Sequence, residues 1–223
     1  MRITSAELLE PSRLVKLAKR IDLDQAQDFS SGIPKPGGTV YLCAADSQGM
    51  MISFIQSNYA GFGSGVVIPG TGIAMQNRGA CFNLETGHPN CVGPSKRPYH
   101  TIIPGFVTRT TPTGEEPAMA FGVMGGFMQP QGHVQVMMRM IDFAQNPQAA
   151  LDAPRWQWMQ GKSIQLEPGF SDATIAELRR RGHEITIADA RTVTFGRGQA
   201  IVRMSDGWMG ASDLRADGIV AAR

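Results

Sequence analysis

The chain has 223 residues, of which 42% are hydrophobic and 18% are charged, and its formal net charge is +2. This length and apolar content suit one large domain or two small ones with a buried core. So weak a net charge disfavours a nucleic-acid partner or an anionic membrane surface, and no apolar run approaches the ~18 residues of a membrane span.

Residues 5–20 are predicted to be helical, because leucine, valine and alanine recur there at helical spacing. The start of the chain has no apolar core of a signal peptide, which favours a cytoplasmic location, although a separately exported fragment also fits. Residues 28–38 have no regular pattern, and their proline, glycine and serine content predicts an exposed linker that is easily cut.

Strand and turn signals begin after the linker and predict an α+β fold, with antiparallel sheet covered by helices. The order of elements does not suggest the βαβ repeats of a dinucleotide-binding fold. The predicted strands cover residues 39–45, 50–56, 72–77, 101–109, 118–123, 185–187, 199–204 and 208–211, and the predicted helices lie near 130–145 and over 171–181.

The three cysteines, Cys43, Cys81 and Cys91, are an odd, sparse set and do not indicate a disulfide framework. Cys43 lies in an apolar strand and is expected to be a buried thiol. His88, Cys91 and His100 do not have the spacing of a zinc site, so loop histidines without a metal are the better interpretation.

Two glycine-rich stretches raise the question of ligand binding. The sequence GFGSG at 61–65 resembles a phosphate-binding loop, but β-branched residues and Pro69 follow it rather than a helix. A tight loop is therefore the better interpretation. Gly125 and Gly126 precede a predicted helix, and their N–H groups could bind a developing oxyanion. Taken alone, the pair is explained more simply by a strand-to-helix turn.

The stretch GGTVYLCAADSQG, residues 37–49, admits two interpretations. Two glycines can simply form the loop before a strand that starts at Thr39. Alternatively, the chain is cut between Gly38 and Thr39, and Thr39 becomes an N-terminal nucleophile. The stretch by itself does not decide between them.

Several stretches together resemble, in order, the small-subunit half of the γ-glutamyltransferase (γ-glutamyltranspeptidase) family of N-terminal-nucleophile (Ntn) hydrolases. They are GGTVYLCAADSQG, FGSGVVIPGTGI, GPSKRPYHTIIP, the glycine pair of VMGGFMQ, LDAPRW, LEPGF and GASDLR. The resemblance implies a partial set of αββα layers. It also implies that residues 1–38, with LAKRIDLDQA, match the end of the large subunit and that residues 39–223 form the catalytic region.

The resemblance implies a mechanism in which a precursor cuts itself before Thr39, which then attacks a γ-glutamyl amide such as glutathione. Water or an amine resolves the acyl-enzyme. A freed α-amine has an unperturbed pKa of about 7.7–8.0 and can serve as the base that a weakly nucleophilic hydroxyl requires. By the same resemblance, Gly125 and Gly126 supply oxyanion-hole N–H groups, and Ser57 stands where the family has a second threonine.

The sequence departs from the family pattern where the family holds the glutamate α-amine. Tyr59 replaces an asparagine, Cys81 stands in the place of an acidic residue, and His100-Thr101 replace a serine pair. Arg78 replaces an amide or acid and could pair with a carboxylate, so that the acyl group is an acid without an α-amine, such as glutaryl. An acyl group of this kind resembles what is expected of the cephalosporin-acylase-like branch of the family. A structural ion pair is the alternative role for Arg78.

The expected substrate is a small-molecule amide, and Tyr59, Arg78, His100 and Thr101 are expected to line its acyl pocket beside Ser57. No metal or organic cofactor is implied by the resemblance. The family's large subunit is almost wholly absent from this chain, so a large-subunit-like chain or segment is an expected partner. The rival interpretation is an inactive truncated remnant that serves only as a structural or partner-binding fragment.

Overall fold

The computed structural model describes residues 4–28 and 38–222, and the strands within these ranges form three sheets. Their orders are β1-β2, β3-β4-β8-β9 and β5-β6-β7. The strands are β1 (Gly38–Ala45), β2 (Met51–Tyr59), β3 (Gly105–Thr111), β4 (Gly114–Met124), β5 (Trp156–Gln160), β6 (Ser163–Leu166), β7 (Glu184–Ile187), β8 (Arg197–Arg203) and β9 (Trp208–Ser212). The helices are α1 (Ser5–Leu8), α2 (Pro11–Ala18), α3 (Met128–Ile141), α4 (Pro147–Asp152) and α5 (Asp172–Arg180), with short 3₁₀ turns η1 (Arg78–Cys81) and η2 (Val193–Phe195).

The predicted α+β class with antiparallel sheet is confirmed, and so are the two predicted hairpins, now β1-β2 and β3-β4. Only β6 and β7 pair in parallel among the described strands, and α5 forms the crossover between them. Most of the predicted linker, residues 29–37, lies outside the described residues.

Two predicted elements are wrong, and two strands escaped prediction. The single helix over 5–20 is instead α1 and α2, because Pro11 starts a new helix that the Glu10 side chain caps. Residues 72–77 form no strand, and only an isolated bridge joins Ala74 to Val67. The two strands that the sequence did not predict are β5 and β6.

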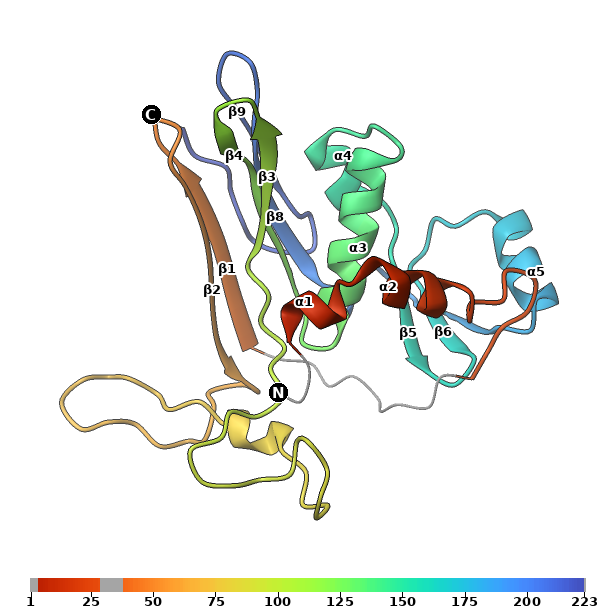
Figure 1. Ribbon diagram of the computed structural model, residues 1–223, viewed down its shortest axis with the longest axis horizontal. Helices are drawn as coiled ribbons and strands as arrows, with labels where there is room; N and C mark the ends of the chain where they lie inside the picture. Colours follow the sequence, from red (N-terminus) through yellow and green to blue (C-terminus); the bar gives the residue numbers. More distant parts are fainter. Residues whose placement is uncertain (1–3, 29–37, 223) are drawn as a thin grey trace.

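The first two sheets pack face to face, and helices cover the second sheet from its other side (Figure 1). The β1-β2 hairpin lies on β4 and β8, while α3 and α4 lie on the opposite face of the same four-stranded sheet. Tyr41 of β1 is 4% exposed and rests on Gly122 of β4. A Cβ at Gly122 would come within 2.5 Å of the Tyr41 ring, so glycine permits this close layer contact.

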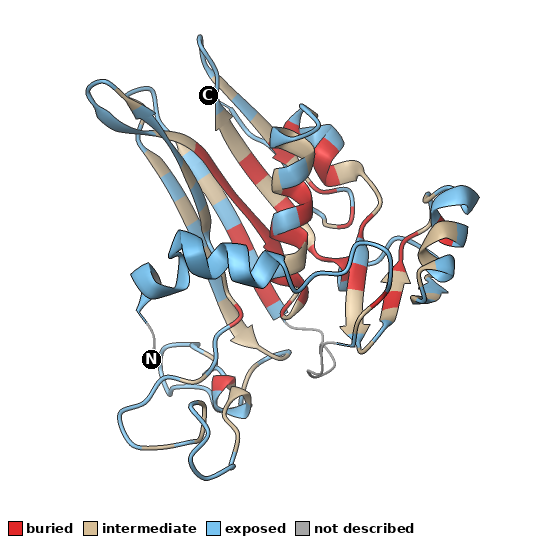
Figure 2. Cartoon of the chain, turned by 45° about the vertical axis from the view of Figure 1, so that its right-hand side comes forward, coloured by how far each residue is buried: buried red, intermediate tan, exposed pale blue. Residues whose placement is uncertain are grey.

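The main core lies between the four-stranded sheet and α3, where Figure 2 shows the densest burial. Met119, Phe121 and Val123 alternate along β4 and pack toward α3. His133 of α3 is buried beside them and accepts a hydrogen bond from the Val123 N–H at 3.0 Å through Nε2. Burial lowers the pKa of His133 to about 4, so the ring is neutral at physiological pH.

Two glutamines of α3 hold the edge strand of the third sheet. Gln135 accepts from the Trp156 N–H at 3.0 Å and donates to the Trp156 carbonyl at 2.9 Å. Gln131, one turn earlier, makes the same pair of contacts with Trp158, at 2.7 and 3.3 Å. The side-chain amides thus take the place of a neighbouring strand on the free side of β5.

Four buried charged side chains form a buried ion cluster (Arg155, Glu167, Asp213 and Arg215). Arg155 donates to Asp213 at 2.6 Å, and Arg215 donates to Asp213 at 3.0 Å and also bonds to Glu167. Arg155 further donates to the carbonyls of Phe195 and Gly196. Two positive and two negative charges balance here, which is the condition under which burial of charge is tolerated.

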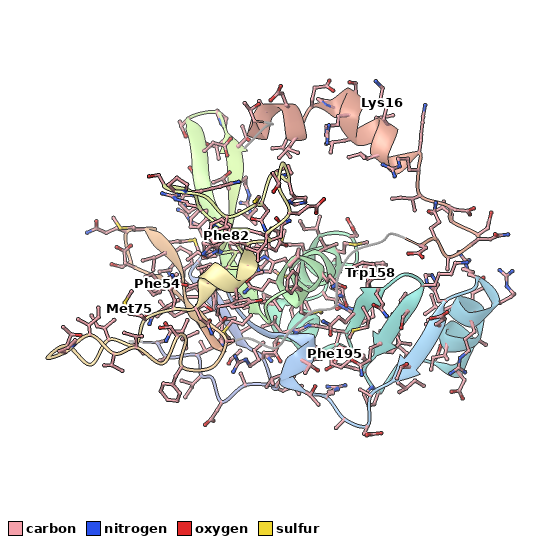
Figure 3. The ribbon with its side chains drawn as sticks, turned by 90° about the horizontal axis from the view of Figure 1, so that it is seen from below. Lys16, Phe54, Met75, Phe82, Trp158 and Phe195 are labelled. Carbon is pink, nitrogen blue, oxygen red and sulfur yellow. The ribbon has the colours of Figure 1, made fainter. Side chains whose placement is uncertain are left out.

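Apolar side chains stay exposed on the outer face of the first sheet and along α2. The outer face of the β1-β2 hairpin presents Val40, Leu42, Ile52 and Phe54, each close to half exposed or more. The helix α2 buries no residue, and Figure 3 shows it, marked by Lys16, standing apart from the sheets. Within the described ranges, no helix combines the length and apolar character needed to cross a membrane.

Candidate active site

Thr39 is the second residue of β1 and is 7% exposed. Its register partner in β2 is Ser57, and the pairing shifts between Gly38 and Thr39. The Thr39 hydroxyl Oγ1 donates to Ser57 Oγ at 3.0 Å. The hairpin therefore brings two hydroxyls together that are 18 residues apart in the sequence.

Ser57 Oγ is the centre of a hydrogen-bond network. It donates to the Gly38 carbonyl oxygen at 3.1 Å and accepts from the Tyr59 N–H at 2.9 Å and from Arg78 Nη2 at 3.1 Å. A hydroxyl oxygen has two acceptor positions, and three donors approach it once Thr39 is counted. The Thr39 hydroxyl is the donor that is most free to rotate away.

Arg78 begins the turn η1 and is 4% exposed. Its Nη1 donates to Thr101 Oγ1 at 2.7 Å, and its guanidinium carbon lies 4.7 Å from the Tyr59 ring centroid. Among the ion pairs formed within residues 4–28 and 38–222, none includes Arg78. A buried cation without a carboxylate partner is an attractive position for an anionic group of a ligand.

We name Thr39, Ser57, Arg78 and Arg197 the nucleophile corner. Arg197 was missed by sequence reasoning. It starts β8, pairs in register with Met124 of β4, and its Nη2 donates to the Thr39 carbonyl oxygen at 3.2 Å. The only local signal in the sequence is a cation between two glycines at the start of a strand.

Two further predicted pocket residues flank Arg78. Tyr59 has φ of 75°, a left-handed conformation that is strained for an aromatic residue. Burial and the neighbouring Cys81 raise the pKa of Tyr59, so its phenol is neutral. His100 is largely exposed, but partial desolvation of its ring, together with the positive charges of Arg78 and Arg97, lowers its pKa.

Gly125 and Gly126 form the turn from β4 into α3, with φ of 142° and 60°. Their carbonyls accept the N–H groups of Met128 and Gln129 at 3.0 and 3.1 Å. In the described part of the chain, their own N–H groups donate no hydrogen bond outside the strand ladders. These groups lie at the positive end of α3, and the start of α3 lies at the same end of the layers as the start of β1 (Figure 1).

Within the described residues, the cysteines and histidines do not gather into a metal-binding cluster. Cys43, Cys81 and Cys91 are free thiols, and burial raises the pKa of Cys43 to about 11. The described residues contain no cluster of three or more histidine, cysteine or acidic side chains that could hold a metal ion.

Comparison with known proteins places this geometry in context. A family model described as Gamma-glutamyltranspeptidase matches residues 1–223. The oxamate amidohydrolase proenzyme of Klebsiella pneumoniae subsp. pneumoniae is 38% identical over 221 residues, which cover 96% of this chain and 41% of that protein. The glutathione hydrolase-like YwrD proenzyme of Bacillus subtilis is 36% identical over 191 residues, or 83% of this chain and 36% of the relative.

A solved structure agrees with the sequence comparisons. The cephalosporin acylase from Bacillus halodurans superposes with a TM-score of 0.87 and 52% identity, covering 100% of this chain and 40% of that one. The chain thus spans about two fifths of the length of the proteins that it matches.

Proposed function

Because the chain belongs to the gamma-glutamyltranspeptidase family, we propose that it carries the catalytic half of an Ntn amidohydrolase or acyltransferase. The proposed substrates are γ-glutamyl or glutaryl amides, such as glutathione. The observation that carries the proposal is the pair of contacts at Ser57, which joins the Thr39 hydroxyl at 3.0 Å to the Gly38 carbonyl at 3.1 Å. The hydroxyl and the peptide bond before it thus share one hydrogen-bonding partner.

Activation is proposed to be a cut between Gly38 and Thr39. Thr39 Oγ1 attacks the Gly38 carbonyl carbon, the C–N bond breaks, and the Thr39 nitrogen takes the proton and becomes an amine. Ser57 donates to the carbonyl oxygen as negative charge develops there, and Arg78 strengthens this donor by its own bond to Ser57 Oγ. Water then hydrolyses the ester on Thr39 and releases Gly38 as a carboxylate.

Turnover reuses the same hydroxyl on an external amide. The freed Thr39 amine takes the proton from Oγ1 as this oxygen attacks the amide carbonyl, and the N–H groups of Gly125 and Gly126 stabilise the oxyanion. The amine passes its proton to the leaving nitrogen, which departs and leaves an ester on Thr39. Water or an acceptor amine cleaves that ester and restores the hydroxyl.

Arg78 is proposed to hold a carboxylate on the acyl group. Its burial without an acidic partner in the described residues, 4.7 Å from the Tyr59 ring centroid, supports this role. Thr101 orients the guanidinium, while Tyr59 and His100 are proposed to complete the pocket walls. The name of one similar protein, the oxamate amidohydrolase proenzyme, fits this idea, since oxamate bears a carboxylate without an α-amine.

The partner proposed for this chain is a large-subunit-like segment or chain. Residues 1–38 are proposed to belong to the end of that segment, and residues 39–223 to the catalytic region. Two observations support this proposed partner. The relatives are longer than this chain, and the apolar face of β1-β2 is exposed, as a surface that another layer covers would be.

Intact-mass measurement on the purified protein tests the proposal most directly. Incubation should produce two fragments that meet between Gly38 and Thr39. The processed protein, assembled with its large-subunit-like part, should hydrolyse members of an amide series whose acyl groups are γ-glutamyl, glutaryl and oxalyl, the last as in oxamate. If γ-glutamyl amides react as fast as the amides whose acyl groups lack an α-amine, the role given to Arg78 is wrong.

The second candidate function is a truncated remnant that serves as a structural or partner-binding fragment. The exposed apolar face of β1-β2 suits such a partner-binding role. A chain that keeps its full mass, and does not cleave amides when a large-subunit-like partner is supplied, would support the remnant.

A further inference from the structure

Arg197 contacts the backbone of Thr39, the residue proposed as nucleophile. Its Nη2 donates to the Thr39 carbonyl oxygen at 3.2 Å, across 158 residues of sequence. Its register partner, Met124, directly precedes Gly125 and Gly126. Arg197 therefore links Thr39 to the end of β4 that leads into the Gly125-Gly126 turn.

The groups that face Thr39 make its surroundings positive. On β8 there is Arg197, and on η1 there is Arg78, one hydroxyl away through Ser57. None of the ion pairs found between described residues includes either guanidinium. Among the described residues, the other titratable groups that we place at this end are Tyr41 and Cys43 of β1, Tyr59 of β2, Cys81 of η1, Arg97 and His100.

Four of these groups, Tyr41, Cys43, Tyr59 and His100, do not offset the positive charge. Burial raises the pKa of both Tyr41 and Cys43, and the pKa of Tyr59 is raised as well, so the three are uncharged at neutral pH. The lowered pKa of His100 keeps its ring neutral. The described ends of β4 and α3 near the corner, residues 122–129, carry no titratable side chain.

A freed Thr39 amine would stand on the same residue as the carbonyl that Arg197 holds. A nearby cation disfavours protonation of an amine, because the two positive charges repel each other. The unperturbed pKa of an α-amine is about 7.7–8.0, so a fall of one unit makes most of it available as a base at pH 7.5.

We propose that Arg197 is a positioning residue for the proposed acyl transfer, which holds the Thr39 carbonyl in place and keeps the freed α-amine unprotonated. The proposal rests on the function proposed above, because only a cut before Thr39 produces that amine. Arg197 acts on the base and need not touch the substrate.

The test measures the amine itself rather than turnover. The complete protein, with its large-subunit-like part, is processed and then labelled with a small amine-acylating reagent at a series of pH values. Labelling of the Thr39 α-amine is quantified by mass spectrometry of the new N-terminal peptide. A parallel version with a site-specific protease site directly before Thr39 supplies the amine even where self-cleavage fails.

Three variants separate charge from packing. Arg197→Gln keeps a hydrogen-bond donor but removes the charge and is expected to raise the labelling midpoint by about one pH unit. Arg197→Met, also neutral, should do the same, while Arg197→Lys should keep the midpoint of the unchanged protein. The acid limb of kcat/KM should move with the midpoint in each case.

Arg203→Gln is the matched control. Arg203 lies at the other end of β8, exposed and 3.5 Å from Glu116, roughly 20 Å along the strand from Arg197. Its removal takes one cation from the same strand and should leave the midpoint unchanged.

The outcomes distinguish the inference from the proposed function. If both neutral variants label with the midpoint of the unchanged protein, the inference is overturned, whatever happens to activity. A raised midpoint in a protein that cleaves no amide supports the role of Arg197 and contradicts the proposed function. An equal loss of activity in the lysine and glutamine variants without any change of midpoint means a packing role only and also overturns the inference.

Discussion

Two regions of the molecule enclose buried or half-buried arginines, and the charges have different partners in each. In the buried ion cluster, Arg155 and Arg215 meet two carboxylates, and every charge has a partner. In the nucleophile corner, Arg78 and Arg197 bond only to hydroxyls and to a carbonyl within the described residues. The contrast fits a structural role for the first region and our proposal that the second keeps its positive charge available for a ligand carboxylate or for the Thr39 amine.

The largest expected effect tests the nucleophile corner. In the complete protein, Thr39→Ala should abolish both the cut before residue 39 and amide turnover, with a loss of roughly 10³-fold or more, because no hydroxyl remains to attack. Intact mass and an amide-hydrolysis assay measure both effects. Thr39→Ser keeps a hydroxyl and should retain part of each. Processing and turnover that survive in the alanine variant would remove the basis of the proposed mechanism.

The next effect tests the buried ion cluster. Asp213→Ala leaves two arginines without that carboxylate and should lower the free energy of unfolding by about 3–5 kcal/mol. Urea unfolding followed by circular dichroism measures the loss. Glu177→Ala is the control, because Glu177 pairs with Arg180 and Arg181 on the surface of α5 and should change stability little. Equal effects of the two substitutions would mean that the cluster does not hold the fold.

The pH dependence of the free energy of unfolding tests the core between the four-stranded sheet and α3, where His133 is buried. His133 has a folded-state pKa of about 4 against an ordinary 6.5. The unfolded chain therefore binds a proton first as the pH falls, and stability should decrease from about pH 6.5 down to about pH 4, by at most roughly 3 kcal/mol. Unfolding curves across this window measure it. His133→Gln can still accept from Val123 and should lose this part of the slope, whereas an unchanged slope would assign it to other groups.

The smallest expected effect sharpens the contrast between the two kinds of arginine. Arg78→Gln should weaken kcat/KM for a carboxylate-bearing amide by roughly 10- to 100-fold, since a charge-assisted hydrogen bond contributes about 1.5–3 kcal/mol. The same substitution should not destabilise the protein as Asp213→Ala does, because no buried carboxylate loses its partner. Kinetics with a charged and a neutral acyl amide, together with urea unfolding, test both statements. A large loss of stability would assign Arg78 to the fold instead.

The sequence predicted the parts of the molecule that local chemistry determines. Turn residues between apolar runs placed both hairpins, and the first hairpin sets the register that brings Thr39 opposite Ser57. The strand predicted over 72–77 fails because an apolar run needs a partner strand, and Ala74 has only one bridge. The strand β5 was missed because its partner on one side is a pair of glutamine side chains, which leave no alternating pattern.

Contacts between residues that lie far apart along the chain could not be predicted from the sequence. LDAPRW, LEPGF and GASDLR were recognised as separate motifs, yet their Arg155, Glu167, Asp213 and Arg215 meet in one cluster. Arg197 has no motif, and its contact with Thr39 depends on how β8 lies against β4 and β1. Such contacts follow from the packing of layers and not from spacing along the chain.

The paired contacts of Gln131 and Gln135 with β5 have a consequence for the behaviour of the protein in solution. The outer strand of a sheet normally displays a row of unpaired amides and carbonyls on which another molecule can stack and begin aggregation. Here the backbone groups of Trp156 and Trp158 are already engaged by amides anchored on a helix of the same chain. An incoming strand would have to displace both glutamines at once, so this border of the molecule is closed to fibril-like growth.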